Sequence, residues 1–425
     1  MKVMSQHVVV VGSGIVGTVV SIALARKGHR VSVIGADQPG SCEMASYGNA
    51  GWLNPGSVVP LSMPGLWRKV PEYLLNANGP LTLRLSAVPQ LASWLVRFMA
   101  AGCTPRRARA IAAALRPFLH DALERHEALA REAGVPEMIK GGGLLIVYPD
   151  RAAYGADALG WSMRRDNGVA WRELEGEELR TLCPGLSERY QFGALITDGG
   201  YCTSPGGYTS ALATYAAGLG VTQVSGRVSG FRKSGGQVLA VEHAGGEIAC
   251  DRVVIAGGIG TTELARMLSD TVPLVSERGY HVQVSAQDVA LPVPTMMSDL
   301  KFGITPMGNE IRGAGQVEFA RRGRAPDWRR ARIILECIRA SFPSARIESF
   351  EKVARWMGNR PSTPDCLPVI GVSPHASNVV YASGHGHLGL VSSPYTADIV
   401  ADLIDGVSRT DIKPYDPARF CRFRL

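Results

Sequence analysis

Continuous apolar runs and glycine-rich turns mark both ends of the chain. The run from His7 to Val11 is largely β-branched, which is typical of a central parallel strand buried on both faces. The spacing predicts a helix over 18–27, with Gly28 as its C-terminal stop, and a second strand over 31–34. Together these segments predict a βαβ unit of about thirty residues.

The middle of the chain changes from helical to alternating spacing. Helical spacing occurs at 91–98, and Thr104 with Pro105 opens a helical region to residue 133 that Pro117 should break or kink. Further segments predict a strand at 141–148, a helix at 208–217 and a buried strand at 252–256. Short alternating strands between 273 and 319 predict an antiparallel sheet. A helix over 328–342, a strand over 379–381, a glycine loop and a helix over 395–404 complete the pattern.

Length and composition fit an ordinary globular protein. The 425 residues suggest two or three domains at about 150 residues each. With 46% apolar and 19% charged residues, the composition excludes disorder, collagen and coiled coil. The net charge of +8 fits an anionic ligand, an acidic substrate or an anionic surface.

The cysteine spacing and the N-terminal apolar run bear on two other interpretations, a cysteine-based metal or redox site and a signal peptide. No CxxC pair occurs among the eight cysteines, which argues against a zinc ribbon or a redox pair and leaves reduced, cytosolic cysteines as the expectation. The stretch 8–25 imitates a signal peptide. Its three glycines favour a buried strand, a turn and a helix instead, and no other stretch approaches the length of a membrane span.

The first chemical motif is Gly12, Gly14 and Gly17, a GxGxxG between strand and helix. This spacing lets the backbone approach a pyrophosphate at a helix N-terminus and predicts dinucleotide binding. The acidic residue that normally binds the adenosine ribose is replaced by Gly35. Asp37, two residues later, either reaches the ribose or is a solvated turn residue.

A second motif distinguishes between dinucleotides. The segment 252–260 is a hydrophobic strand that ends in another glycine turn, with Ala256, Gly257 and Gly258 at the turn. Flavin disulfide reductases and amine oxidases carry such a strand beside the cofactor, although an ordinary strand–helix turn has the same appearance.

Five further segments resemble the D-amino acid dehydrogenases, within the larger family of FAD-dependent amine oxidoreductases related to D-amino acid oxidase and glycine oxidase. They are Ser46-Tyr-Gly-Asn-Ala-Gly51 followed by Pro55-Gly56, Thr203-Ser-Pro-Gly-Gly-Tyr208, Val272-Pro-Leu-Val-Ser-Glu-Arg-Gly-Tyr280, the G-x-R-P-x-T-P-D-x-x-P-x-[IV]-G match at 358–371, and Gly384-His-Gly-His-Leu-Gly389. The resemblance covers nearly the whole chain.

The resemblance implies an α/β fold in two parts. A discontinuous, Rossmann-like FAD-binding domain is expected from residues 1–100, 190–270 and 350–425. A substrate domain of the D-amino acid oxidase type, an antiparallel sheet with helices, is expected from 101–189 and 271–349.

The same resemblance assigns roles to three side chains. Arg360 holds the substrate carboxylate by a bidentate fork, unless it is a structural partner of Asp365. Tyr280 assists the carboxylate or lines the pocket, unless it is a core residue, and Arg278 faces solvent or fixes a loop. His387 lines the substrate cavity or, with His385, helps the glycine loop to stabilise charge on the reduced flavin. A metal site at this His-x-His is not expected.

The expected cofactor is non-covalent FAD, because Gly358 stands where covalent relatives place a cysteine. The residues expected to contact it are Gly12, Ser13, Gly14, Ile15, Val16, Gly17, Asp37, Ser46, Asn49, Ala50, Gly51, Val228, Ala256, Gly257, Gly258, Arg360, Gly384, His385, Gly386, His387, Leu388 and Gly389.

The implied reaction is oxidative deamination of a D-amino acid to an imine and then a 2-oxo acid, with hydride passing from Cα to flavin N5. Position and electrostatics then matter more than a catalytic base. Oxidation of D-proline or cis-4-hydroxy-D-proline, and a non-catalytic FAD-binding subunit, remain alternatives.

The expected partners are an amino-acid substrate and a quinone or respiratory carrier, without nucleic acid. Basic clusters at Arg106, Arg107, Arg109 and Arg116 and at Arg321, Arg322, Arg324, Arg329, Arg330 and Arg332 are solvated faces or, with Trp67, Trp94 and Phe98, a peripheral membrane contact. The expected location is the cytoplasm, with the inner face of the membrane as the alternative.

Overall fold

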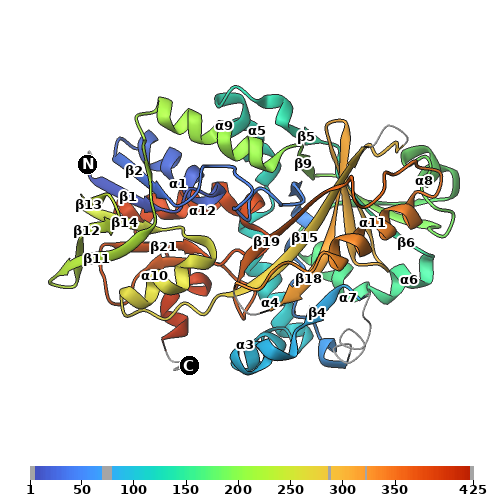
Figure 1. Cartoon of the computed structure of the whole chain (residues 1–425). Helices are drawn as coiled ribbons and strands as arrows, with labels where there is room; N and C mark the ends of the chain where they lie inside the picture. Colours follow the sequence, from blue (N-terminus) through green and yellow to red (C-terminus); the bar gives the residue numbers. More distant parts are fainter. Residues whose placement is uncertain (1–4, 69–78, 286–288, 321–322, 422–425) are drawn as a thin grey trace.

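The N-terminal strand β1 (His7–Val11) lies in the middle of a six-stranded sheet (Figure 1). The computed structural model describes residues 5–68, 79–285, 289–320 and 323–421. The order is β10 (Thr222–Ser225), β2 (Arg30–Gly35), β1, β14 (Arg252–Ile255), β21 (Val379–Ser383) and β20 (Val369–Val372). The first five strands are parallel, and β20 runs antiparallel to β21. The sheet therefore joins strands from distant parts of the sequence.

Helices cover one face of this sheet and share a core with it. The core includes Val8, Val10 and Val254 together with side chains from α1 (Ile15–Arg26), α4 (Pro105–Leu115), α5 (Ala122–Glu132), α9 (Pro205–Gly218) and α12 (Gly389–Ile404). On the other face, Val9 and Val11 pack with α10 (Thr261–Met267) and with a small sheet of β11 (Val228–Ser234), β12 (Gln237–His243) and β13 (Gly246–Ala249). This two-sided covering explains why β1 is apolar and buried from Val8 to Val11.

The second large sheet is mainly antiparallel. Its order is β19 (Ala354–Ser362), β15 (Val275–Ser285), β18 (Glu310–Phe319), β17 (Phe302–Met307), β16 (Thr295–Met297), β6 (Leu144–Tyr148), β8 (Phe192–Ile196) and β7 (Trp171–Glu175), with β4 (Leu81–Leu83) pairing β18. Helix α11 (Arg329–Ser341) packs on β15 and β18 through Ile334, Leu335 and Ile338.

Four further α-helices are described: α3 (Val88–Ala101), α6 (Arg151–Ala156), α7 (Ala158–Asp166) and α8 (Gly176–Leu182). A small three-stranded sheet joins β3 (Trp52–Leu53), β9 (Gly200–Cys202) and β5 (Ile139–Gly141).

Most of the predicted elements are present, with shifted ends. Thr104 caps α4 by accepting from the Arg107 N–H, and a 3-10 turn at Arg116–Phe118 separates α4 from α5, as Pro117 requires. The last helix begins at Gly389 rather than at Tyr395 and contains Pro394. The run 8–25 forms most of β1, the glycine turn and most of α1, as the strand, turn and helix expected from its glycines.

Several segments pair across the boundaries expected from the sequence. Strands β8 and β19 fall in ranges assigned to the FAD-binding domain, yet both belong to the second large sheet, and β4 pairs with the same sheet. Conversely, α4 and α5 fall in 101–189 but share the core of the six-stranded sheet. The division into two domains at those residues stays a prediction.

None of the helices in the described ranges is long and apolar enough to cross a membrane.

Candidate active site

The glycine turn after β1 brings the backbone of β1, α1 and β14 into close approach. Gly12 has φ +118°, a conformation that favours glycine, and a Cβ there would overlap Ala256 O. A Cβ at Gly17 would overlap Gly12 O, so this glycine allows α1 to pack directly on the turn. The turn and the start of α1 thus form a cradle of backbone that fits the pyrophosphate of FAD.

The cradle opens into a cavity of about 1010 Å³ that runs between the two large sheets. Its lining includes most of the residues expected to contact the cofactor: Gly12, Ser13, Gly14, Ile15, Val16, Asp37, Ser46, Asn49, Ala50, Val228, Ala256, Gly257, Gly258, Arg360, His385, Gly386, His387, Leu388 and Gly389. Gly17, Gly51 and Gly384 lie behind this wall. Gly51 and Gly384 have positive φ and leave no room for a side chain against Cys202 O and Thr363, respectively.

Gly35 makes room for Ser13 at the end of β2. A Cβ at residue 35 would overlap Ser13 Oγ, which donates to Asp37 O over 3.0 Å. The exposed Asp37 also lines the cavity. Position 35 must therefore lack a side chain because Ser13 occupies that space. Asp37, two residues later, supplies a carboxylate at the cavity wall.

Arg360 lies on β19 beside Glu277 of the neighbouring strand β15, and both line the cavity. Arg360 Nη1 donates to Glu277 Oε1 over 3.1 Å, and Ser362 Oγ donates to Glu277 Oε2 over 2.9 Å. Gly279 leaves space for the guanidinium, because a Cβ there would overlap it. Asp365 pairs instead with Arg419, so the alternative partner considered for Arg360 was wrong.

The loop after β21 carries the two histidines of the GHG-x-LG motif. His385 is buried with Nε2 3.0 Å from Thr396 Oγ1, and burial lowers the pKa of its imidazole to about 3. His387 lies at the cavity wall, where its side chain is exposed to the cavity. Desolvation by the protein around it lowers the pKa of its imidazole as well. Asn49 Nδ2 donates to His387 O over 3.3 Å and joins this loop to the Ser46–Gly51 segment. Both imidazoles are therefore neutral groups near neutral pH.

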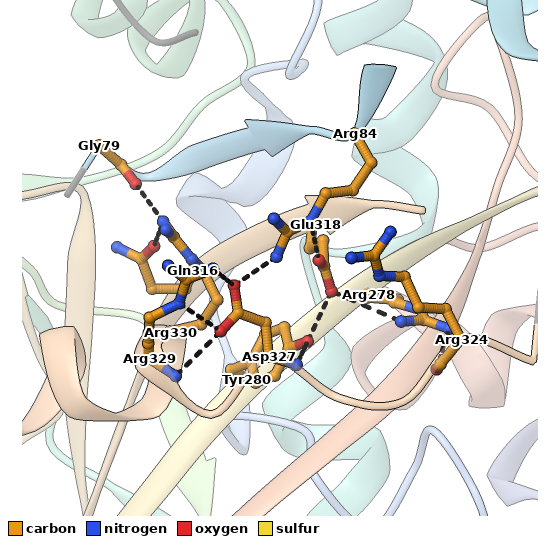
Figure 2. Close-up of polar contacts among 10 residues, drawn as sticks. All are labelled: Gly79, Arg84, Arg278, Tyr280, Gln316, Glu318, Arg324, Asp327, Arg329 and Arg330. Carbon is orange, nitrogen blue, oxygen red and sulfur yellow. Dashed lines mark hydrogen bonds and ion pairs between the residues drawn. The ribbon is translucent and has the colours of Figure 1, made fainter. Parts of the chain in front are cut away.

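Tyr280 is placed away from the cavity, which contradicts the role expected for it. Its side chain is 1% exposed and packs on the α11 side of the large sheet. Its hydroxyl donates to Glu318 Oε2 over 2.6 Å and accepts from the Asp327 N–H over 3.0 Å (Figure 2). The reason is strand alternation: Glu277 and Gly279 face the cavity, so Tyr280 faces the opposite side.

Tyr280 belongs to a buried charged cluster with Arg84, Arg278, Glu318 and Asp327 (Figure 2). Glu318 accepts from Arg84 Nε over 2.7 Å and pairs with Arg278 Nη1 over 3.5 Å. Arg278 Nη2 donates to Arg324 O over 2.7 Å. Arg278 is thus buried and fixes a loop; the expectation that it faces solvent was wrong.

Three side chains of the site were not found from the sequence. Trp52 and Trp356 line the cavity, and Trp52 Nε1 donates to Thr305 Oγ1 over 2.8 Å. Arg312 donates from Nη1 to Tyr47 O and Asn49 O over 2.9 and 2.8 Å, and burial lowers its pKa to about 10. Arg312 attaches the second sheet to the Ser46–Gly51 segment, but no motif marks it in the sequence.

The remaining expectations concern cysteines, metals and basic clusters. None of the eight cysteines lines the cavity, and no group of three or more potential metal ligands occurs in the described parts of the chain. Arg106, Arg107, Arg109 and Arg116 are exposed, whereas Arg330 is buried. Arg321 and Arg322 lie outside the described residues. Trp94 is buried against Phe98 and Phe319, so it is not an exposed anchor.

Comparisons with known proteins agree with this geometry. Residues 7–403 match the family model described as FAD dependent oxidoreductase. The chain is 41% identical over 417 residues to a D-amino-acid oxidase of Bradyrhizobium diazoefficiens, covering 98% of this chain and 99% of the relative. It is 30% identical to a D-amino acid dehydrogenase of Agrobacterium fabrum, with 97% and 98% covered.

The fold is similar to the crystal structure of glycine oxidase from Geobacillus kaustophilus, with a TM-score of 0.73, 23% identity and coverage of 98% and 99%. The glycine cradle, the cavity between two sheets and a family match over almost the whole chain lead to one conclusion. The chain belongs to the family of FAD-dependent oxidoreductases that includes the D-amino acid oxidases.

Proposed function

We propose that the protein oxidises a D-amino acid to its imino acid, which water then converts to a 2-oxo acid and ammonia. The single observation that carries the proposal is Arg360 in the wall of the cavity that begins at the glycine cradle. FAD, when bound, accepts the two electrons and the hydrogen lost from the substrate Cα. The names of the two curated relatives support a D-amino acid as substrate.

The side chains of this protein bind and orient the substrate. Arg360 has N–H groups besides the one given to Glu277, and these can hold a carboxylate in a charge-assisted contact. Glu277 and the space at Gly279 fix where the guanidinium lies. Trp52, Trp356 and Phe302 add apolar walls that exclude water. The proposal assigns no side chain as the base that removes a proton from Cα.

Two alternatives receive less support. Neither curated relative is named for a cyclic secondary amine, which disfavours D-proline and its hydroxy derivative. A non-catalytic FAD-binding subunit would not require an arginine in the cavity wall.

Anaerobic mixing of the FAD-loaded protein with a panel of D-amino acids, L-amino acids and D-proline tests the proposal. At least one D-amino acid should bleach the flavin absorbance, and its L-enantiomer should not. No bleaching by any D-amino acid would overturn the proposal. Bleaching by D-proline alone would favour the cyclic amine.

We propose a quinone as electron acceptor and a membrane surface as its source. The supporting observation is a set of exposed apolar side chains: Leu61, which also lines the cavity, Trp67 and Val96 on α3. Leu61 is 47% and Trp67 61% exposed, and Arg68 lies 5.1 Å from the Trp67 ring. Ser62 accepts from the Gly102 N–H at the end of α3, so these segments adjoin.

Turnover with a soluble quinone analogue, compared with hydrogen peroxide formation in air, tests the acceptor. Faster quinone reduction, together with co-sedimentation with anionic vesicles that Trp67→Ser weakens, is the expected result. Stoichiometric peroxide and no vesicle binding would contradict both parts.

A further inference from the structure

A second arginine, Arg164 on α7, lines the same cavity as Arg360. Its side chain is 11% exposed and is held on two sides. Nε donates to Gly56 O over 3.2 Å, and the guanidinium carbon lies 4.4 Å from the centroid of the Trp161 ring. The backbone carbonyl and the indole therefore fix the orientation of the guanidinium without neutralising its charge.

The charge of Arg164 is poorly compensated. Its Nη1 is buried and has no hydrogen-bond partner. The closest carboxylate oxygen, Asp157 Oδ2, is 3.9 Å from Nη1 and already accepts from Tyr148 Oη over 2.9 Å. Burial lowers the pKa of Arg164. Arg360, in contrast, has a close carboxylate partner in Glu277.

A weakly paired, largely buried cation carries a large desolvation cost, and buried charges are normally paired closely. A ligand carboxylate that reached the exposed part of the Arg164 guanidinium would offset that cost. The surroundings fit such a ligand, because Leu144, Ile146, Leu159 and Met296 also line the cavity. Apolar walls with one well-placed polar group are typical of small-molecule sites.

We propose that Arg164 binds the distal carboxylate of the substrate, so that the protein prefers dicarboxylic D-amino acids. Arg360 takes the α-carboxylate in this arrangement, and Arg164 selects the side chain. The inference rests on the function proposed above and names its substrate class. It adds a binding residue and no chemical step.

Arg164→Met, with Arg165→Met as matched control, tests this in the FAD-loaded protein. Arg165 follows on the same helix, is exposed and does not line the cavity. The wild type should favour D-glutamate over D-glutamine in kcat/KM. Arg164→Met should lower the value for D-glutamate by about tenfold or more, as expected for a hydrogen bond between charged groups, and change the value for D-glutamine less than the value for D-glutamate. Arg165→Met should change neither.

Equal losses for both substrates, or no loss, would overturn the proposal. A second measurement tests the proposed binding role of Arg164 independently of whether the protein oxidises D-amino acids. Perturbation of the flavin spectrum by glutarate and by butyrate reports binding without oxidation, and Arg164→Met should weaken glutarate selectively. If no D-amino acid is oxidised but glutarate still binds through Arg164, the proposed function fails and the anion site stands. If Arg164→Met unfolds, Arg164→Lys serves instead because it keeps the positive charge. This variant should retain part of the preference for glutarate over butyrate, and complete loss of that preference would contradict the assignment.

Discussion

Arg360 Nη1 and Glu277 Oε1 form an ion pair of 3.1 Å between adjacent strands in the wall of the cavity. Glu277 is buried, whereas the Arg360 side chain is partly open to the cavity. The arginine therefore meets a ligand with part of its charge already balanced. This arrangement weakens the attraction for a carboxylate and fixes the direction of the guanidinium.

Glu277→Gln removes the negative charge; the single amide oxygen can still accept from Arg360, whereas the amide NH2 would donate to Ser362 Oγ instead of accepting from it. We expect a monocarboxylate to bind several-fold more tightly, because the charge of Arg360 is then uncompensated. Titration of the flavin spectrum with butyrate measures the Kd. Weaker binding would mean that the charge of Glu277 is needed to position Arg360.

Arg360→Lys keeps a positive charge but loses the fork geometry. We expect FAD still to bind, because the glycine cradle is elsewhere in the cavity. The variant should lose roughly 2–5 kcal/mol in kcat/KM for D-amino acids, the scale for breaking a buried charged pair. Amine analogues without a carboxylate serve as the control. Equal losses for both classes would assign Arg360 to the cofactor or to the fold.

Tyr280→Phe separates a catalytic role from a structural one. The phenol bonds the buried carboxylate of Glu318, and a hydrogen bond to a charged group contributes about 1.5–3 kcal/mol. We expect the free energy of unfolding to fall by that amount while kcat is retained. Urea denaturation and steady-state kinetics provide the two measurements. A large fall in kcat at unchanged stability would restore the catalytic assignment.

The stability of the protein should depend on His126 between about pH 6.5 and pH 4. His126 is buried near Tyr208 Oη and Leu390 O, and burial lowers its pKa to about 4. The unfolded chain, with a pKa of about 6.5, takes up the proton first as the pH falls. The stability contributed by neutral His126 is therefore present above about pH 6.5 and is lost progressively toward pH 4.

His126→Gln should be less stable at pH 7 but should lose less stability on acidification. Thermal melts at several pH values test this, with the exposed His120→Gln as control. His281 and His385, whose pKa values are also lowered by burial, should leave part of the acid dependence in the variant. A variant with the same acid dependence as the wild type would contradict the prediction.

The sequence predicts well those features that local backbone chemistry determines. Gly12 and Gly17 are required by close backbone approach, so their spacing identifies the cradle. Tyr280 shows the limit of this reasoning, because a motif places a residue on a strand but not on one of its two faces. A β-bulge between Tyr280 and His281 in the pairing of β15 with β18 further alters the facing of that segment.

Hydrogen-bond partners that are far apart in the sequence could not be predicted for a related reason. Nothing local marks Arg312 as the donor to Tyr47 O, or Glu277 as the partner of Arg360, because each pair is joined only by the packing of distant strands. Strand pairing rather than sequence order likewise places β8 and β19 in the second sheet, which no local pattern in the sequence indicates.

The strand order of the six-stranded sheet has a consequence for biosynthesis. β1 pairs with β14, and β14 pairs in turn with β21 near the C-terminal end, through contacts such as Val253 with Val379. The Gly384–Gly389 loop follows β21, so the ribosome makes this part of the cofactor site last. FAD cannot meet its complete binding site before this loop has left the ribosome, so the last step of cofactor binding must follow synthesis of the chain as far as Gly389.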